Sequence, residues 1–245
     1  MEQQVKAKVE NEIMTITVDN PGMKNGLNWI GLNQLADYYQ QIIDDENIRL
    51  GIVTATGEYF YTGGRVDPNA PGEQPKYALA IRRATEILGK VQKPMIAAIN
   101  GHCLKAGMSM LANCDIAVAK AGIRFGFPEV RMGGVPMMVL VDIADQMPRK
   151  KAIEYLLTSW EFSADEALTM GLVNRIVPEN ELWPTVNRYA QTLLETPKEL
   201  VEMTLYAYKK VCMIQGRENR FDFASEYLAD KILPTMAKIK QHYNP

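Results

Sequence analysis

Residues 99–119, INGHCLKAGMSMLANCDIAVA, contain the feature that most constrains this chain. The apolar run MIAAIN at residues 95–100 predicts a strand that leads into Gly101. Two small residues, Ala106 and Gly107, then open a segment that predicts a short helix over 106–113, and the apolar run DIAVA follows it. The first N–H groups of a helix have no partner inside the helix and carry partial positive charge. This stretch therefore predicts a helix start whose backbone can face a ligand.

Strand and helix patterns alternate through the first two thirds of the chain. Residues 5–18 predict a β-hairpin that turns at Asn11-Glu12, and residues 57–75 predict a long loop rich in glycine and proline. Helices alone close the chain, which argues for an α/β core with a helical C-terminal extension. The predicted helices are 30–46, 76–91, 106–113, 137–146, 149–158, 163–170, 182–195, 198–213 and 217–239; the predicted strands include 49–55, 95–100, 115–119 and 172–178.

Composition narrows the class of protein. The 245 residues are 47% hydrophobic and 23% charged, which suits one large domain or a domain with a small appendage. The net charge of −2, without a basic run, disfavours nucleic-acid and membrane partners. Three cysteines without metal-ligand spacing, and no signal-peptide pattern, favour reduced thiols and a cytoplasmic location. Two histidines are too few for a histidine metal cluster, so we expect no metal site.

Two loops are candidates for the chemistry. One holds the adjacent glycines Gly63 and Gly64, and the other is the helix start at Ala106. One backbone N–H from each could hold a carbonyl oxygen that becomes an oxyanion. The alternative is that Gly63-Gly64 forms a plain turn. The sequence does not show whether the two loops meet.

The ordered motifs of this chain resemble those of the crotonase superfamily, the enoyl-CoA hydratase/isomerase family. They are NPGMKNGLN, FYTGG, INGHCLKAGMSMLANCDIAVA, FGFPEVRMGGVP and SADEALTMGLVNRIVP, and the similarity runs from about residue 20 to about residue 213. The resemblance implies a spiral of ββα turns over residues 1–190, with the active site, and a C-terminal helical region over 191–245. That region usually assembles trimers, often paired as hexamers. Family members bind an acyl thioester, usually of coenzyme A, and stabilise its enolate; no cofactor beyond the thioester carrier is implied.

Site residues follow from the matched motifs. Gly64 and Ala106 match the two backbone donors of the family's oxyanion hole, and Glu129 matches the glutamate of its F-G-x-P-E segment. The apolar residues around Glu129 are expected to raise its pKa, although a glutamate here could instead be solvated or cap the next segment. Ser109 stands where typical hydratases of the family have a second glutamate. Two interpretations of Ser109 stay open: a small residue that fills a helix face, or a polar group that holds a water molecule.

Two further departures from the family pattern concern substrate binding. Lys105 replaces a residue that is usually glycine; it is either solvated or a phosphate contact. Met137 and Met138 replace a stretch that is often glycine-rich. They line the acyl pocket in one interpretation and pack on a helix face in the other.

The missing second carboxylate sets the functional expectation. A single glutamate suffices to shift a double bond, so the resemblance favours a Δ3-Δ2 enoyl-CoA isomerase, with an acyl-CoA or acyl-carrier-protein thioester as substrate. The alternatives are a decarboxylase or a hydrolase or lyase of C–C bonds, a weak hydratase with water on Ser109, and an inert subunit or scaffold. Glu129 and the small residues at both donor positions speak against the inert subunit.

Overall fold

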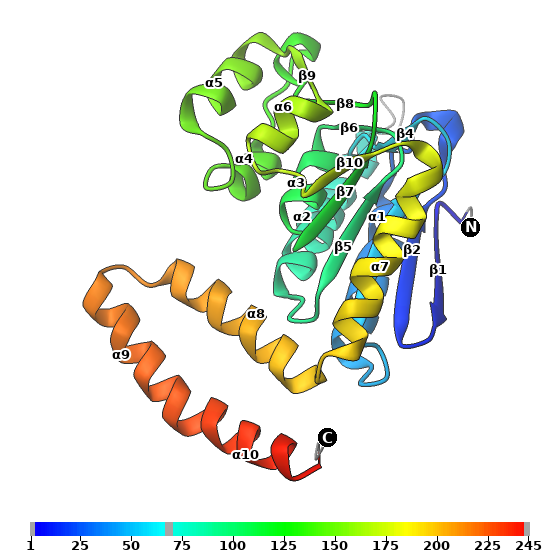
Figure 1. Cartoon of the computed structure of the whole chain (residues 1–245). Helices are drawn as coiled ribbons and strands as arrows, with labels where there is room; N and C mark the ends of the chain where they lie inside the picture. The colour runs from blue at the N-terminus through cyan, green and yellow to red at the C-terminus, as the bar shows by residue number, and fades with distance from the viewer. Residues whose placement is uncertain (1–2, 67–70, 243–245) are drawn as a thin grey trace.

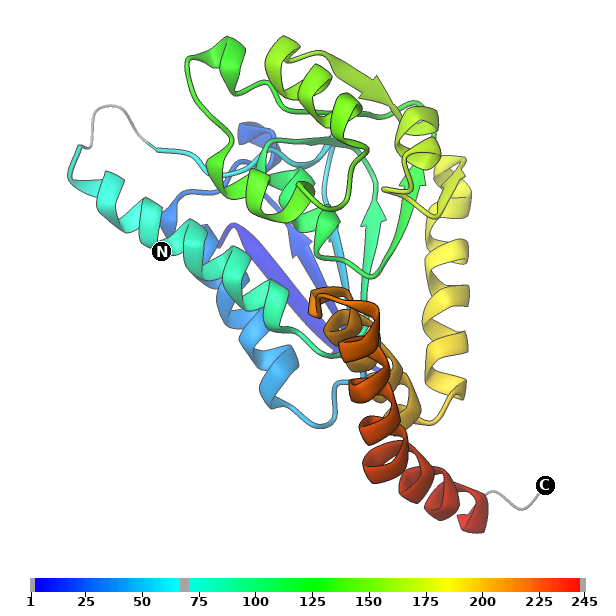
Figure 2. The ribbon, with the colours of Figure 1, turned by 90° about the vertical axis from the view of Figure 1, so that its left-hand side faces the viewer.

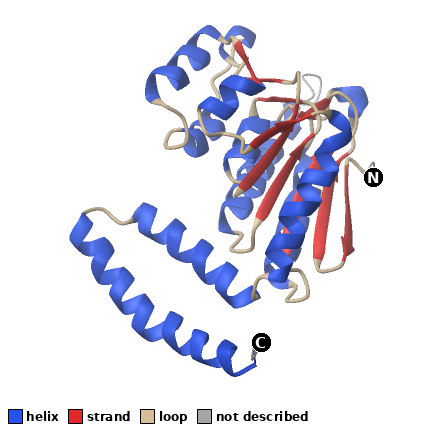
Figure 3. Cartoon of the chain, in the orientation of Figure 1, coloured by secondary structure: helices blue, strands red, loops and turns tan. Residues whose placement is uncertain are grey.

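The computed structural model describes residues 3–66 and 71–242, and the chain builds two β-sheets (Figures 1 and 3). The larger sheet has the order β1-β2-β3-β5-β7-β10. Only the β1–β2 hairpin is antiparallel; every other pair in this sheet is parallel. The strands are β1 (Val5–Glu10), β2 (Ile13–Val18), β3 (Leu50–Ala55), β5 (Met95–Ile99), β7 (Ile116–Lys120) and β10 (Arg175–Val177).

A smaller sheet has the order β4-β6-β8-β9, and each of its strands is three residues long. The first three strands are parallel, and β9 closes the sheet antiparallel to β8. The chain passes from β3 to β4, from β5 to β6 and from β7 to β8, so each turn gives one strand to each sheet. This is the ββα spiral expected from the sequence. The strands are β4 (Tyr59–Tyr61), β6 (His102–Leu104), β8 (Arg124–Gly126) and β9 (Glu161–Ser163).

Helices cover both faces of the larger sheet (Figure 2). The helices α1 (Trp29–Asp44) and α2 (Gln74–Lys90) lie on one face, and α7 (Leu182–Glu195) lies on the other. Alternate residues of β3 serve the two faces: Ile52 packs with the α7 cluster, whereas Val53 belongs to the main core. Burial on both faces explains why β3 and β5 read as continuous apolar runs.

Three short strands escape the sequence prediction. The segment 57–75 was expected to be loop but contains β4, and the turn expected after residue 100 contains β6. The third, β9, lies just before the helix predicted at 163–170. A three-residue strand is too short to show an alternating pattern, so periodicity cannot detect it. Residues 67–70 of the predicted loop lie outside the described residues.

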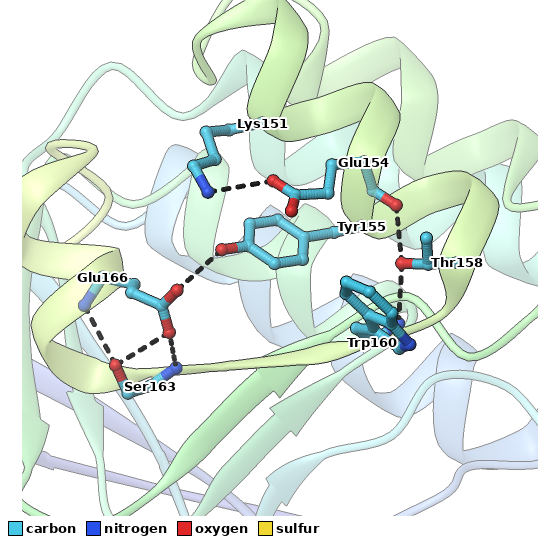
Figure 4. A network of polar contacts seen from close by, with 7 residues as sticks. All are labelled: Lys151, Glu154, Tyr155, Thr158, Trp160, Ser163 and Glu166. Carbon is cyan, nitrogen blue, oxygen red and sulfur yellow. Dashed lines mark hydrogen bonds and ion pairs between the residues drawn. The ribbon is translucent and has the colours of Figure 1, made fainter.

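A helical lobe follows β8 and contains α4 (Met137–Ile143), α5 (Arg149–Thr158) and α6 (Ala164–Thr169). Figure 4 shows the polar network that joins α5 to α6. Ser163 and Glu166 form a capping box at the start of α6, and the Tyr155 hydroxyl donates to Glu166 Oε1 over 2.8 Å. On α5, Lys151 pairs with Glu154 at 2.9 Å. The network fixes α6 against α5 through one carboxylate, that of Glu166.

This lobe also holds the turn that follows Glu129. The backbone N–H of Arg131 donates to Ser159 Oγ over 3.2 Å, and the Arg131 guanidinium donates to the Thr158 carbonyl over 3.2 Å. Both acceptors lie at the end of α5, so the position of the lobe influences the position of Glu129.

The C-terminal helices extend from the two-sheet body as a bent arm (Figure 1). It comprises α8 (Lys198–Met213), α9 (Arg217–Tyr227), a π-helical turn at Leu228–Ile232 and α10 (Leu233–His242), where one helix over 217–239 was predicted. Neither α8 nor α9 contains a buried residue, and Met213 is 78% exposed. The predicted division at residue 190 falls inside α7, which packs on the sheet, and the two-domain description stays a prediction.

We predict that Glu166→Ala lowers the free energy of unfolding by about 1 kcal/mol, because it removes a capping-box partner and the acceptor of Tyr155. Urea unfolding at pH 7 measures the change. Asp165→Ala is the matched control, since Asp165 lies beside Glu166 in the first turn but is not part of the capping box. An equal effect of the two substitutions would contradict the assigned role.

Candidate active site

The Gly63-Gly64 loop presents a backbone donor away from the core. The Gly63 carbonyl accepts from the Leu27 N–H at 3.0 Å, and the Arg65 N–H donates to the Leu27 carbonyl. A trans peptide holds its C=O and N–H in opposite directions, and no described peptide bond is cis. The Gly64 N–H therefore points away from Leu27.

The start of α3 provides the second donor and lies against this loop. Ala106 is the first residue of α3, so its N–H has no acceptor within the helix. The preceding Lys105 has a φ of 54°, and its carbonyl accepts from Met108. A Cβ atom built on Gly63 would lie 3.2 Å from the Ala106 nitrogen. The two loops that the sequence could not place relative to each other are thus in contact, and Gly63, with a φ of 84°, is the residue that permits it.

Glu129 lies beyond the end of β8, where the chain turns into the lobe. Its Oε2 atom is buried and has no hydrogen-bond partner among the described residues. Burial raises the pKa of Glu129 above 4.5, the ordinary value for a glutamic acid. The positive charge of Lys105 acts in the opposite direction. The apolar setting in FGFPE therefore has the effect on the pKa that the sequence predicts.

One pocket of about 300 Å³ brings these groups together. The Gly63-Gly64 loop, the start of α3 and Glu129 all line it, each from the segment that follows one strand of the smaller sheet. Its walls include both methionines singled out in the sequence; Met137 is 63% exposed. The lining residues are Gly63, Gly64, Tyr77, Ile81, Lys105, Ala106, Glu129, Val135, Pro136, Met137, Met138 and Val139.

Tyr77 is the pocket residue that the sequence analysis missed. It lies on α2, and a Cβ built on Gly64 would overlap its ring, so the phenol covers that glycine. Burial, and secondly the charge of Glu129, raise the pKa of Tyr77. The inward residues of α2 recur from Tyr77 through Ile81, Ala84 and Leu88. That helical spacing could have placed Tyr77 on the buried face.

Ser109 has a polar partner, as one interpretation expected, but this partner is a carboxylate from another helix. The Ser109 hydroxyl is buried and donates to Asp142 Oδ2 on α4. Burial raises the pKa of Asp142, against hydrogen bonds from Ser109 and Asn113 that lower it. Ser109 is not among the residues that line the Glu129 pocket. The residue that the sequence analysis matched to a second glutamate therefore forms a contact between α3 and α4, and a water molecule on Ser109 stays a prediction.

Two kinds of site receive no support from the described residues. They include no group of three or more His, Cys, Asp or Glu side chains placed to hold a metal ion. None of the helices among them is long and apolar enough to cross a membrane. Lys105 is half-buried in the pocket wall, and its contact with a phosphate stays a prediction.

The sequence matches the family model for enoyl-CoA hydratase/isomerase over residues 8–232. It is 28% identical over 227 residues to the mitochondrial enoyl-CoA hydratase domain-containing protein 3 of Xenopus laevis, which covers 91% of this chain and 77% of that protein. It is also 28% identical over 207 residues to (E)-benzylidenesuccinyl-CoA hydratase of Thauera aromatica, covering 83% of this chain and 81% of that protein. The crystal structure of human enoyl coenzyme A hydratase domain-containing protein 3 superposes with a TM-score of 0.88 at 25% identity, over 99% of both chains.

The Ser109–Asp142 contact generates a stability prediction. Ser109→Glu places a second carboxylate at a buried position against the half-buried Asp142, so we expect a loss of about 3 kcal/mol at pH 7. Adding Asp142→Asn removes the repulsion, and the double variant recovers at least about 1 kcal/mol of that loss. Urea unfolding of both variants, with Ser109→Ala as the control for the lost hydrogen bond, measures the coupling. A Ser109→Glu variant as stable as the parent protein would rule out the contact.

Proposed function

This chain belongs to the enoyl-CoA hydratase/isomerase family, the crotonase superfamily, and from that premise we propose that it transfers a proton on an acyl-CoA thioester with Glu129 as the acid–base group. One observation carries the proposal: Glu129, Gly64 and Ala106 line the same pocket. A raised pKa suits a carboxylate that must both take and return a proton near neutral pH.

The two backbone donors supply the electrostatic part of the proposal. The thioester oxygen accepts hydrogen bonds from the N–H groups of Gly64 and Ala106. When a proton leaves the neighbouring carbon, negative charge grows on that oxygen, so the donors stabilise the transition state more than the ground state. Small residues at both positions let the thioester approach the backbone closely.

The reaction we propose first is the shift of a double bond from C3 to C2. The Glu129 carboxylate removes a proton from C2 of a 3-enoyl thioester, which leaves a dienolate whose oxygen lies between the two donors. Glu129 then returns the same proton to C4, and the new double bond lies between C2 and C3. One carboxylate completes the cycle without a net change of protons. The sequence of α3 supports this reaction, because AGMSMLA contains no second acid and its Ser109 hydroxyl is bonded to Asp142.

Hydration of a 2-enoyl thioester is the second candidate. The similarity to (E)-benzylidenesuccinyl-CoA hydratase of Thauera aromatica favours it. A panel of 3-enoyl-CoA, 2-enoyl-CoA and malonyl-type thioesters separates isomerase, hydratase and decarboxylase by their products.

The same pocket suggests how the acyl carrier binds. We propose that Lys105, in the pocket wall, contacts a phosphate of coenzyme A or of a carrier protein. Met137 and Met138 line the space that the acyl group occupies. No cofactor beyond the thioester carrier takes part.

We predict that Glu129→Gln lowers turnover by about 10²-fold or more while substrate binding is largely kept. In the parent protein kcat/KM falls as the pH drops through the raised pKa of Glu129, because only the ionised form removes a proton; the variant lacks this limb. Steady-state kinetics between pH 5 and 8 measure both effects. Glu179→Gln, at a carboxylate that is 82% exposed, is the control. Near-normal turnover of Glu129→Gln would refute the assignment.

The exposed arm leads to a prediction about assembly. We propose that α8–α10 pack against other copies of the chain, since Leu228 is 47% exposed and Leu233 is 54% exposed. Light scattering should give three or six times the 27.6 kDa of the chain. Leu233→Asp should lower that mass, whereas Val9→Asp on β1 should not. A monomeric parent protein would contradict the proposal.

A further inference from the structure

Tyr77 lies where the phenol can act on the chemistry of the pocket. Its ring covers Gly64, one of the two proposed oxyanion donors, and its side chain shares the pocket with Glu129. The residue is half-buried, and its helix α2 packs against α1.

The polar side chains of the pocket are few. Among the twelve described residues that line it, Tyr77, Lys105 and Glu129 are the ones with polar side chains. The Oε2 atom of Glu129 is a buried acceptor without a partner among the described residues, and the Tyr77 phenol is a hydrogen-bond donor in the same pocket. A buried carboxylate oxygen that lacks a hydrogen bond is destabilising, so a nearby donor is favoured to face it.

We propose that Tyr77 is a positioning residue for Glu129: its hydroxyl donates to the carboxylate in the free protein and keeps that hydrogen bond when an acyl group excludes water from the pocket. The kinetic consequence of this inference rests on the proposed function. The pairing of Tyr77 with Glu129 does not, because it is a property of the free protein.

Pairing with Tyr77 would serve Glu129 in two ways. A hydrogen bond to one carboxylate oxygen fixes the side-chain rotamer and directs the other oxygen at the substrate. It also favours the ionised form, so it limits the rise in pKa that burial causes. The phenol keeps its own proton throughout, because burial and the charge of Glu129 both raise the pKa of Tyr77.

Other charged groups near Glu129 do not replace this donor. Lys105, which precedes α3, lowers the pKa of Glu129 through its charge. Arg131 follows Glu129 in the turn, but its guanidinium donates to the Thr158 carbonyl of α5. Tyr77 thus differs from both: it is a neutral donor in the pocket lining, contributed by α2.

Tyr77→Phe tests the pairing directly, because it keeps the ring over Gly64 and removes only the hydroxyl. Carbon-13 NMR of protein labelled at glutamate carboxyl carbons, with Glu129→Gln to assign the resonance, reports the pKa of Glu129 without any substrate. We expect the substitution to raise this pKa by about one to two units, the equivalent of one hydrogen bond to a charged group. Tyr59→Phe is the matched control, since Tyr59 is also half-buried but contacts His102 outside the pocket.

The kinetic test uses whichever thioester the substrate panel identifies. Tyr77→Phe should lower kcat about tenfold, change KM less than about threefold, and move the acidic limb of kcat/KM to higher pH. A pKa of Glu129 that is unchanged or lowered in Tyr77→Phe, or raised equally in Tyr59→Phe, overturns the inference. A raised pKa in a protein that turns over no thioester upholds the pairing and rejects the proposed function.

Discussion

The site depends on three short parallel strands that end at the same edge. In the smaller sheet Tyr61 pairs with Cys103, and Cys103 pairs with Phe125. Two residues after each of these positions the chain reaches Gly63, Lys105 and Phe127, so three segments far apart in sequence leave the sheet side by side. Parallel pairing fixes this arrangement, because the carboxyl ends of parallel strands lie together. The relative positions of the oxyanion loops and of the Glu129 turn therefore follow from the register of this one sheet.

The larger sheet makes that register rigid. Its central strands are buried between α1 and α2 on one face and α7 on the other, so they cannot slide without exposing apolar side chains (Figure 2). Each central strand runs directly into a strand of the smaller sheet. A short strand that would be marginal alone is therefore held by the longer strand before it.

Two carboxylates near α3 have different surroundings. Asp142 is paired with Ser109, and the pair joins α4 to α3. Glu129 shares a pocket of about 300 Å³ with the start of α3, and its buried Oε2 atom has no partner among the described residues. A carboxylate whose hydrogen bonds are formed within the protein stabilises one arrangement of the chain. A buried carboxylate oxygen without a hydrogen bond instead favours binding a proton or a donor group of a ligand. The lobe of α4–α6 supports both carboxylates, through α4 for Asp142 and through the end of α5 for the Glu129 turn.

The sequence by itself determined the long elements, the family and the residues that carry its motifs. Apolar runs such as MIAAI and helical patterns such as 182–195 are strong because each spans enough residues to show its period. Only the tertiary structure decided that Gly63 touches Ala106, that Ser109 meets Asp142 and that Tyr77 covers Gly64. The strands that bring the loops together have three residues each, and the partners come from distant helices. Contacts of this kind leave no local pattern, because pairing and packing between remote segments create them.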